Sequence, residues 1–261
     1  MTWMDTAAEL RTARVPAVLI TLAAVRGHAP REAGAKMIAT ADDLFGTIGG
    51  GNLEMTALTR ARELLAERQA TPEMLTLRLN DKAPAKYGRQ CCGGEVTMLF
   101  EPLPVPASVA IFGIGNIGLE LTRILARHDL DLTVSDSRPE QLEAIDDLET
   151  PVARTRSEFA VVGEEVLTAL PAGAHVVIMT HDHAEDLHLC SAALTRGDLG
   201  SVGLIGSNAK WQRFRKNLAA EGFAPEAIDT MRCPIGPPYL PGKAPATIGV
   251  CVAADLLGRM G

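Results

Sequence analysis

A glycine-rich turn constrains the fold of this chain more than any other feature of its sequence. The turn Gly113-Ile114-Gly115-Asn116-Ile117-Gly118 fits the pattern G-x-G-x-x-G, follows a strand-like apolar segment (108–112) and begins a helical pattern (116–127). In this context Gly113 permits the tight turn, Gly115 lets the backbone approach a phosphate, and Gly118 permits close packing of the helix on the strand. The sequence therefore predicts a phosphate site at a helix N-terminus.

Strands and helices alternate after this turn. Further strands are expected at 132–135, 174–180, 200–205 and 232–235, and further helices at 210–220 and 246–257. This alternation predicts a parallel, doubly wound sheet of the Rossmann-like kind. Asp136 ends the second strand, where such folds place an acid that binds a ribose hydroxyl group. Arg138 follows so closely that pairing with Asp136 is the alternative.

The first half of the chain is less regular and predicts a smaller α+β domain. Strands are expected at 17–25, 36–40, 74–79 and 96–100, and a helix at 52–68. The halves meet at Glu101-Pro102-Leu103-Pro104-Val105-Pro106, where alternate prolines disfavour a helix or a central strand and predict an extended linker. We therefore expect an N-terminal domain (1–101), a linker (102–107) and a Rossmann-like domain (108–261).

Composition excludes several classes of function. The net charge is −7, no long basic run is present, and aromatic residues make up 4% of the chain, which argues against nucleic acid as the main partner. The first ten residues include Asp5 and Glu9 and do not resemble a signal peptide, and no segment approaches the ~18 apolar residues of a membrane helix. The five cysteines have no framework spacing. We expect a cytoplasmic protein with no membrane partner.

Two adjacent cysteines, Cys91 and Cys92, precede Gly93 and Gly94. Consecutive Cα atoms lie about 3.8 Å apart, whereas disulfides usually span roughly 4.4–6.8 Å, so a disulfide between these cysteines would be strained. Zinc sites usually space their cysteines by two to four residues. A soft thiol beside a flexible backbone suits a sulfur-bearing or metal-bearing ligand. The alternative is that one of the cysteines is a small buried apolar residue.

Polar residues follow the later predicted strands, whose carboxyl ends share one edge of the sheet. His181 and His183 could ligate a metal or handle protons, but for a metal we prefer the alternative that these histidines cap the next helix. Ser207 could cap a helix or hold a phosphate, and Cys233 is a further soft thiol. A basic run without acids predicts a solvated helix face at Lys210, Arg213, Arg215 and Lys216.

A second glycine-rich helix start lies in the first half. Gly49-Gly50-Gly51 precedes the helix expected at 52–68, and a loop with Arg31 and Lys36 precedes the glycines. This arrangement predicts another anion site, with an ordinary helix start as the alternative. Two glycine-rich helix starts and two cysteine loops together predict a large anionic ligand with a soft centre, bound between the domains.

These motifs, in this order, resemble the XdhC/CoxI family, and most closely its XdhC branch of xanthine dehydrogenase accessory proteins. The resemblance rests on motifs at 34–37, 46–54, 88–94, 113–118, 136–138, 180–183, 203–207 and 233–236. It implies a chaperone that binds the molybdenum cofactor (Mo-molybdopterin), shields it from oxidation and presents it to a cysteine desulfurase for sulfuration. The chaperone then inserts the cofactor into xanthine dehydrogenase. On this basis we expect a homodimer that acts as a chaperone rather than as an enzyme.

The resemblance also sets the candidate residues. Asn52 stands where many relatives have cysteine, so the thiol role falls to Cys91, Cys92 or Cys233, with Cys92 favoured as the contact to the molybdenum centre. Asn116 stands where many relatives have histidine. No residue is assigned a catalytic role, and the candidate cofactor-binding residues are Gly49, Gly50, Gly51, Cys91, Cys92, Gly93, Gly94, Gly113, Gly115, Gly118, Asp136, His181, His183, Ser207 and Cys233.

Two other functions remain open from the residues alone. An NAD(P)-dependent oxidoreductase would use the glycine turn and Asp136, although the first domain offers no clear catalytic set for such an enzyme. A metal-dependent hydrolase would use His181, Asp182 and His183 and would need a bound metal ion.

Overall fold

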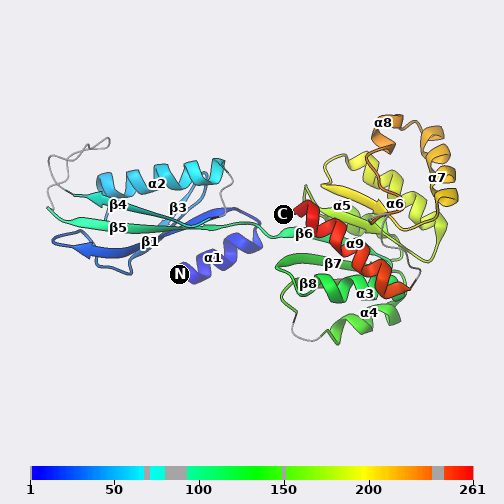
Figure 1. The fold of residues 1–261 in the computed structure, drawn as a ribbon, viewed down its shortest axis with the longest axis horizontal. Helices are drawn as coiled ribbons and strands as arrows, with labels where there is room; N and C mark the ends of the chain where they lie inside the picture. Colours follow the sequence, from blue (N-terminus) through cyan, green and yellow to red (C-terminus); the bar gives the residue numbers. More distant parts are fainter. Residues whose placement is uncertain (1, 68–70, 80–92, 149–150, 237–243, 261) are drawn as a thin grey trace. The chain divides into compact units, whose positions relative to one another are not determined.

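The chain folds into two compact units, Met1–Val105 and Pro106–Gly261. A computed structural model describes every residue except 1, 68–70, 80–92, 149–150, 237–243 and 261 (Figure 1). Each unit has its own five-stranded sheet and its own core. The second unit contains a parallel sheet and the smaller first unit a mixture of helices and antiparallel strands, which confirms the predicted fold class.

The first unit is an antiparallel sheet with the strand order β3-β2-β1-β5-β4. Helix α2 packs on one face of this sheet through Leu53, Ala57 and Leu64, which are buried as the predicted helical pattern requires. Helix α1 lies against a small separate cluster around Leu19 and Ile38. The elements are α1 (Trp3–Thr12), β1 (Ala17–Arg26), β2 (Lys36–Ala39), β3 (Leu44–Gly46), α2 (Gly51–Ala66), β4 (Glu73–Arg78) and β5 (Glu95–Leu103).

The segment predicted as a linker is partly strand. Strand β5 continues to Leu103, and Pro102 lies opposite Val18 of β1. The partner on the other side, β4, pairs with β5 only as far as Phe100. Proline is tolerated there because no second strand needs its missing N–H group. The prediction was therefore wrong at Pro102 and Leu103, and the next strand already begins at Ala107.

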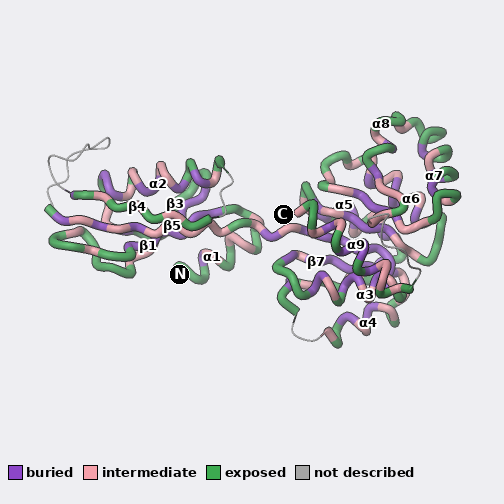
Figure 2. The backbone as a smooth tube through the Cα atoms, viewed as in Figure 1, coloured by how far each residue is buried: buried purple, intermediate pink, exposed green. Residues whose placement is uncertain are grey.

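The second unit is a parallel sheet with the strand order β10-β9-β6-β7-β8. Successive residues of the central strand, β6, point to opposite faces: Phe112 joins one hydrophobic cluster and Ile111 the other. The neighbouring strand β7 is buried over most of its length (Figure 2). The elements are β6 (Ala107–Phe112), α3 (Asn116–Leu125), β7 (Leu130–Asp136), α4 (Pro139–Asp146), β8 (Arg154–Phe159), α5 (Gly163–Ala169), β9 (His175–Ile178), α6 (His183–Arg196), β10 (Ser201–Leu204), α7 (Asn208–Ala220), α8 (Pro225–Ile228) and α9 (Pro245–Met260).

Strand β6 is the topological switch point of this sheet, because the chain continues to β7 on one side of it and reaches β9 on the other. Ligands of open parallel sheets bind beyond the carboxyl ends of the strands at such a point. The last predicted strand, at 232–235, is reduced to one bridge between Arg232 and Gly203. Pro234 has no N–H group to continue the ladder, which explains why pairing stops there.

The helices of the described segments are short, and the longest of them, α2 and α9, have 16 residues each. Within the part of the chain that the structure describes, no helix is long and apolar enough to cross a membrane.

Candidate functional site

The glycine turn joins β6 to α3, and its three glycines meet different surroundings. A Cβ atom on Gly113, which has φ of +98°, would lie 2.3 Å from the carbonyl oxygen of Met179. A Cβ atom on Gly118 would lie 2.1 Å from the carbonyl oxygen of Gly113. A Cβ atom on Gly115 would meet no atom within 4 Å. The first and third glycines therefore allow backbone packing, and Gly115 faces open space.

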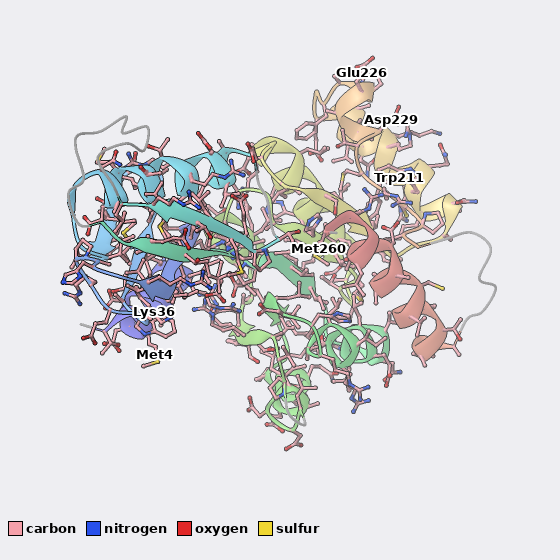
Figure 3. All side chains as sticks on the ribbon, turned by 60° about the vertical axis from the view of Figure 1, so that its left-hand side comes forward. Met4, Lys36, Trp211, Glu226, Asp229 and Met260 are labelled. Atoms are coloured by element: carbon pink, nitrogen blue, oxygen red, sulfur yellow. The ribbon has the colours of Figure 1, made fainter. Side chains whose placement is uncertain are left out.

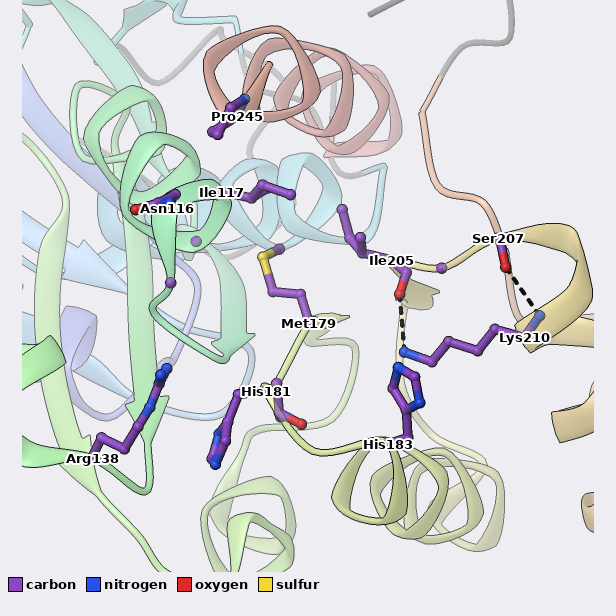
Figure 4. Close-up of a pocket in the computed structure, with 14 residues that line it drawn as sticks. Asn116, Ile117, Arg138, Met179, His181, His183, Ile205, Ser207, Lys210 and Pro245 are labelled. Atoms are coloured by element: carbon purple, nitrogen blue, oxygen red, sulfur yellow. Dashed lines mark hydrogen bonds between the residues drawn. The ribbon is translucent and has the colours of Figure 1, made fainter. Parts of the chain in front are cut away.

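That open space belongs to a pocket of about 530 Å³ within the second unit (Figure 4). The pocket lies beyond the carboxyl ends of β6, β7, β9 and β10, at the switch point of the sheet. Its volume is that of a typical small-molecule site. It is lined by Gly115, Asn116, Ile117, Gly118, Arg138, Met179, Thr180, His181, His183, Ile205, Gly206, Ser207, Lys210 and Pro245.

Four helices turn their first residues toward this pocket: α3, α6, α7 and α9. The Asp182 side chain caps α6 by accepting from the N–H group of Ala184, and Ser207 caps α7 by accepting from Lys210. Gly115, the N-cap of α3, has no side chain to accept a hydrogen bond. Helix N-termini carry partial positive charge, so the pocket favours an anion, most directly at the uncapped start of α3.

Asp136 ends β7 as predicted, but its carboxylate is enclosed. One oxygen accepts from the N–H group of Ile114 at 2.6 Å, and the Arg138 guanidinium binds both oxygens at 2.9 Å. Burial alone would raise the pKa of Asp136, but the hydrogen bonds from Arg138 and Ile114 outweigh it and hold that pKa below its usual value. Only 2% of the Asp136 side chain is exposed, so Arg138 is the group at the pocket and Asp136 positions it.

A second buried carboxylate, Asp186, holds Lys210 in the pocket wall. One Asp186 oxygen accepts from the N–H and hydroxyl groups of Thr180 at 2.9 and 2.8 Å, and the other accepts from the Lys210 ammonium group. The ammonium group also donates to the carbonyl oxygen of Ile205 at 3.2 Å and lies 5.3 Å from the ring centroid of Phe214. Lys210 is thus not part of a solvated face, which corrects the prediction for the basic run.

His181 and His183 both line the pocket, and the structure brings them together with Arg138 and Lys210. Neither histidine caps α6, because Asp182 has that role. Nδ1 of His183 lies 3.4 Å from a guanidinium nitrogen of Arg213. Among the described residues, no group of three or more His, Cys, Asp or Glu side chains could hold a metal ion.

The pocket has a polar and an apolar side. Figure 4 shows Ile117, Ile205 and Pro245 on one side and Arg138 and the histidines on the other. The carboxylates of Asp136 and Asp186 balance the charges of Arg138 and Lys210, so the positive potential that remains at the wall comes from the helix N-termini. Such a pocket can hold a ligand that has an anionic group and a flat apolar body.

Cys233 lies behind the pocket wall rather than in it. A Cβ atom on Gly206 would lie 3.5 Å from its sulfur atom, which is 3.8 Å from the Gly206 carbonyl oxygen. Burial raises the pKa of Cys233 to about 11, although the positive charge of Lys210 opposes this rise. The sulfur is therefore a neutral thiol near pH 7, and a neutral thiol is a poor metal ligand.

The glycine-rich loop of the first unit already binds a carboxylate. Oε1 of Glu54 accepts from the N–H groups of Ile48, Gly49 and Gly50 at 3.0, 3.2 and 2.9 Å, and from the Thr47 hydroxyl group. Burial opposes ionisation of Glu54, but these hydrogen bonds outweigh it and lower the pKa of that carboxyl. The anion predicted at this loop is thus supplied by the chain itself, and Gly51 begins α2.

The glycines after the cysteine pair have a packing role. The N–H group of Gly93 donates to Leu79 at 2.8 Å, and a Cβ atom on Gly94 would lie 2.1 Å from the carbonyl oxygen of His28. Gly94 therefore allows two backbone segments to approach closely. Cys91 and Cys92 lie outside the described residues, and their proposed contact with a cofactor stays a prediction.

Both units contain residues that match models of known protein families. Residues 109–256 match the XdhC Rossmann domain, and residues 10–79 match the XdhC and CoxI family. The chain belongs to the XdhC and CoxI family. Every residue that lines the Rossmann pocket, from Gly115 to Pro245, lies in the part of this XdhC and CoxI chain that matches the XdhC Rossmann domain.

Individual relatives of this XdhC and CoxI chain are distant. The uncharacterized protein YqeB of Escherichia coli (strain K12) is 24% identical over 253 residues, which are 96% of this chain but 45% of YqeB. The chain thus spans less than half the length of that relative. A solved structure from Bacillus halodurans, described as a xanthine dehydrogenase, is 18% identical to this chain and has a TM-score of 0.50. The match covers 99% of this chain and 96% of the chain in that structure. At that identity the likeness concerns the fold alone.

Proposed function

We propose that this chain binds the molybdenum cofactor in the pocket of its Rossmann domain and supports the maturation of xanthine dehydrogenase. One observation carries the proposal: four helix N-termini and the cations Arg138 and Lys210 surround one open pocket that also has an apolar side. Membership of the XdhC and CoxI family supports the choice of cofactor and client.

The side chains present suit the organic part of this cofactor. The phosphate of molybdopterin would be bound by the uncapped N-terminus of α3 and by Arg138, which Asp136 holds in place. The flat pterin would lie against the apolar side that includes Ile117 and Ile205. When bound, the cofactor supplies the molybdenum–sulfur chemistry, and the residues of the chain bind, orient and shield it.

The thiol contact to the molybdenum centre is proposed for Cys92, with Cys91 as its neighbour. The burial of Cys233 and its raised pKa make that thiol the weaker candidate. We further propose that a homodimer presents the cofactor to a cysteine desulfurase for sulfuration and then inserts it into xanthine dehydrogenase. In these roles the chain is a chaperone rather than an enzyme.

The test of cofactor binding is the pterin content of protein purified from a molybdenum-replete host, measured after oxidation to a fluorescent product. We expect wild-type protein and Lys216→Gln to carry pterin, because Lys216 is an exposed lysine of α7 outside the pocket. We expect Asp136→Asn/Arg138→Gln, which leaves no buried carboxylate unpaired, to carry much less. No pterin in the wild type, together with micromolar binding of NAD or NADP, would replace the proposal with a nucleotide-dependent oxidoreductase.

The thiol and partner roles need separate measurements. The variant Cys91→Ala/Cys92→Ala should fold like the wild type and bind the isolated cofactor more weakly. Equal affinity in the variant would remove the thiol assignment but leave the pocket assignment intact. A tagged cysteine desulfurase from the same host should retain the wild-type chain on a column, and failure to do so would contradict the sulfuration role.

A further inference from the structure

A second pocket, of about 270 Å³, lies within the first unit, where α1, the loop before β2, and β3 meet. Its basic side chains are Arg31 and Lys36, and its apolar wall includes Trp3, Ile38 and Phe45. The volume lies just below the range of about 300–1,000 Å³ that is usual for ligand sites, so an occupant must be small. No role at this pocket follows from cofactor binding in the Rossmann domain.

Among the described residues, the groups that hold Lys36 in this wall are neutral. Its ammonium group donates to the hydroxyl oxygen of Thr21 at 2.7 Å and lies 5.3 Å from the ring centroid of Trp3. Thr21 is buried, with 9% of its surface exposed, so its hydroxyl group holds the Lys36 ammonium group at a fixed position. An ammonium group has three N–H donors, and these two contacts leave donor capacity directed to the pocket.

Arg31 adds a second positive charge at the same pocket. Its side-chain stem packs near Gly49, where an added Cβ atom would lie 3.5 Å from Cγ of Arg31. Within the described ranges, neither Arg31 nor Lys36 forms an ion pair with a carboxylate. The two basic residues of the Rossmann pocket, Arg138 and Lys210, differ in this respect because each is paired with a buried aspartate.

The hydroxyl groups at the pocket do not offer further donors. Thr6 donates its hydroxyl hydrogen to the carbonyl oxygen of Thr2 at 3.2 Å, and Thr2 donates its own to the Asp5 carboxylate at 2.8 Å. Asp5 is therefore engaged in capping α1 and does not neutralise Lys36. The charged donors left for a ligand are the Lys36 ammonium and Arg31 guanidinium groups, and both favour an anion.

We propose that this pocket binds a small organic anion, with a carboxylate or phosphate head between Lys36 and Arg31 and a compact apolar body against Trp3 and Phe45. The paired charges bind the head, and the aromatic rings cover the body. Because the proposal uses only residues of the first unit, it stands or fails independently of cofactor binding in the second.

The test uses the tryptophan that lines the pocket as its reporter. The chain has two tryptophans, Trp3 and Trp211, and Trp211 lies on α7 of the second unit (Figure 3). In the variant Trp211→Phe, we expect phenyl phosphate to change Trp3 fluorescence saturably at millimolar concentrations. Inorganic phosphate should bind more weakly because it has no apolar body, and neutral benzyl alcohol should leave the signal unchanged. If Trp211→Phe folds poorly, calorimetry with the same probe compares the wild type with Lys36→Gln, because Lys36 lines the pocket of the first unit and not the Rossmann pocket.

Matched variants locate the effect. Lys36→Gln and Arg31→Gln should each weaken phenyl phosphate binding by about tenfold, a loss equivalent to one good ionic contact. Arg26→Gln removes the same charge from an exposed arginine of the first unit and should bind like the parent. Absence of a saturable change, or equal affinity in Lys36→Gln and Arg31→Gln, would overturn the proposal. Equal affinity for inorganic and phenyl phosphate would overturn the apolar part of the assignment.

Discussion

The ammonium group of Lys210 donates a hydrogen bond to the fully buried carboxylate of Asp186. This pair connects the first turn of α6 to the first turn of α7, and both turns begin at the edge of the sheet where the pocket lies. The remaining oxygen of Asp186 is bound by Thr180, so every charge of the pair has a partner. The pair therefore fixes the shape of the pocket wall as well as its charge.

Replacing only Lys210 should be costly. In Lys210→Met the carboxylate of Asp186 stays buried without its cation, and we expect a loss of about 3–5 kcal/mol in the free energy of unfolding. The double variant Asp186→Asn/Lys210→Gln should recover most of this loss because it removes both charges and keeps hydrogen-bonding groups. Urea unfolding measures both. Equal stability of Lys210→Met and the wild type would show that the pair is not buried as described.

Substitutions at two glycines of the turn should distinguish effects on folding from effects on ligand binding. Gly118→Ala should destabilise the Rossmann domain by several kcal/mol, on the order of other overpacked cores, because its Cβ atom would meet the Gly113 carbonyl oxygen. Gly115→Ala should fold like the wild type, because its φ of −77° suits alanine and no atom lies within 4 Å.

The methyl group of Gly115→Ala would project into the pocket, so this variant should lose pterin while keeping its melting temperature. Thermal melts and pterin assays on the two glycine variants check both parts. A Gly115→Ala protein with full pterin content would contradict the position of the ligand at the start of α3.

Glu54 should make stability depend on pH. Its folded-state pKa is lowered, so its contribution is fully present above the ordinary pKa of 4.5 and is lost as the pH falls below 4.5 through the folded-state pKa. Glu54→Gln should therefore cost about 2 kcal/mol at pH 7, the usual size for hydrogen bonds to a charged group, and less in acid. Glu9→Gln, at an exposed glutamate of α1, is the control for charge. A cost that is the same at pH 3 and pH 7 would contradict this account.

Cys233 should be unreactive in the folded protein. Its pKa of about 11 leaves roughly one thiolate in ten thousand molecules at pH 7. Iodoacetamide followed by mass spectrometry should find Cys233 unmodified at pH 7, increasingly modified above pH 9, and rapidly modified in urea. Rapid modification of the folded protein at pH 7 would restore Cys233 as a candidate ligand.

The features that could be predicted from the sequence are those with a pattern among residues close together in the chain. The glycine turn has a fixed spacing, and the inner strands such as β6 are continuous apolar runs, so the parallel sheet and its phosphate edge could be predicted. Strand β8 escaped prediction because it lies at the edge of the sheet and reads RTRSEF, with most of its residues exposed. Helix α1 buries only Thr6 and offers little apolar pattern.

The parts of the site that could not be predicted from the sequence depend on pairings between distant residues. Asp186 and Lys210 are 24 residues apart, and no local pattern joins them, so the basic run looked like an ordinary solvated face. The occupied glycine loop had a local signal: Glu54 follows Gly50 by four residues, close enough for its carboxylate to fold back onto the loop. The enclosure of Asp136 by Arg138 was the alternative that the sequence had left open, and it is confirmed.

The most direct test of cofactor binding is an anaerobic titration of isolated molybdenum cofactor into the wild-type chain and into a variant without the two pocket cations. The variant combines Asp136→Asn/Arg138→Gln with Asp186→Asn/Lys210→Gln, so that neither buried carboxylate is left unpaired, and Lys216→Gln is the control. We predict saturable binding to the wild type and to Lys216→Gln, and binding at least about tenfold weaker in the combined variant. A folded combined variant that binds the cofactor as tightly as the wild type would contradict the placement of the cofactor in this pocket.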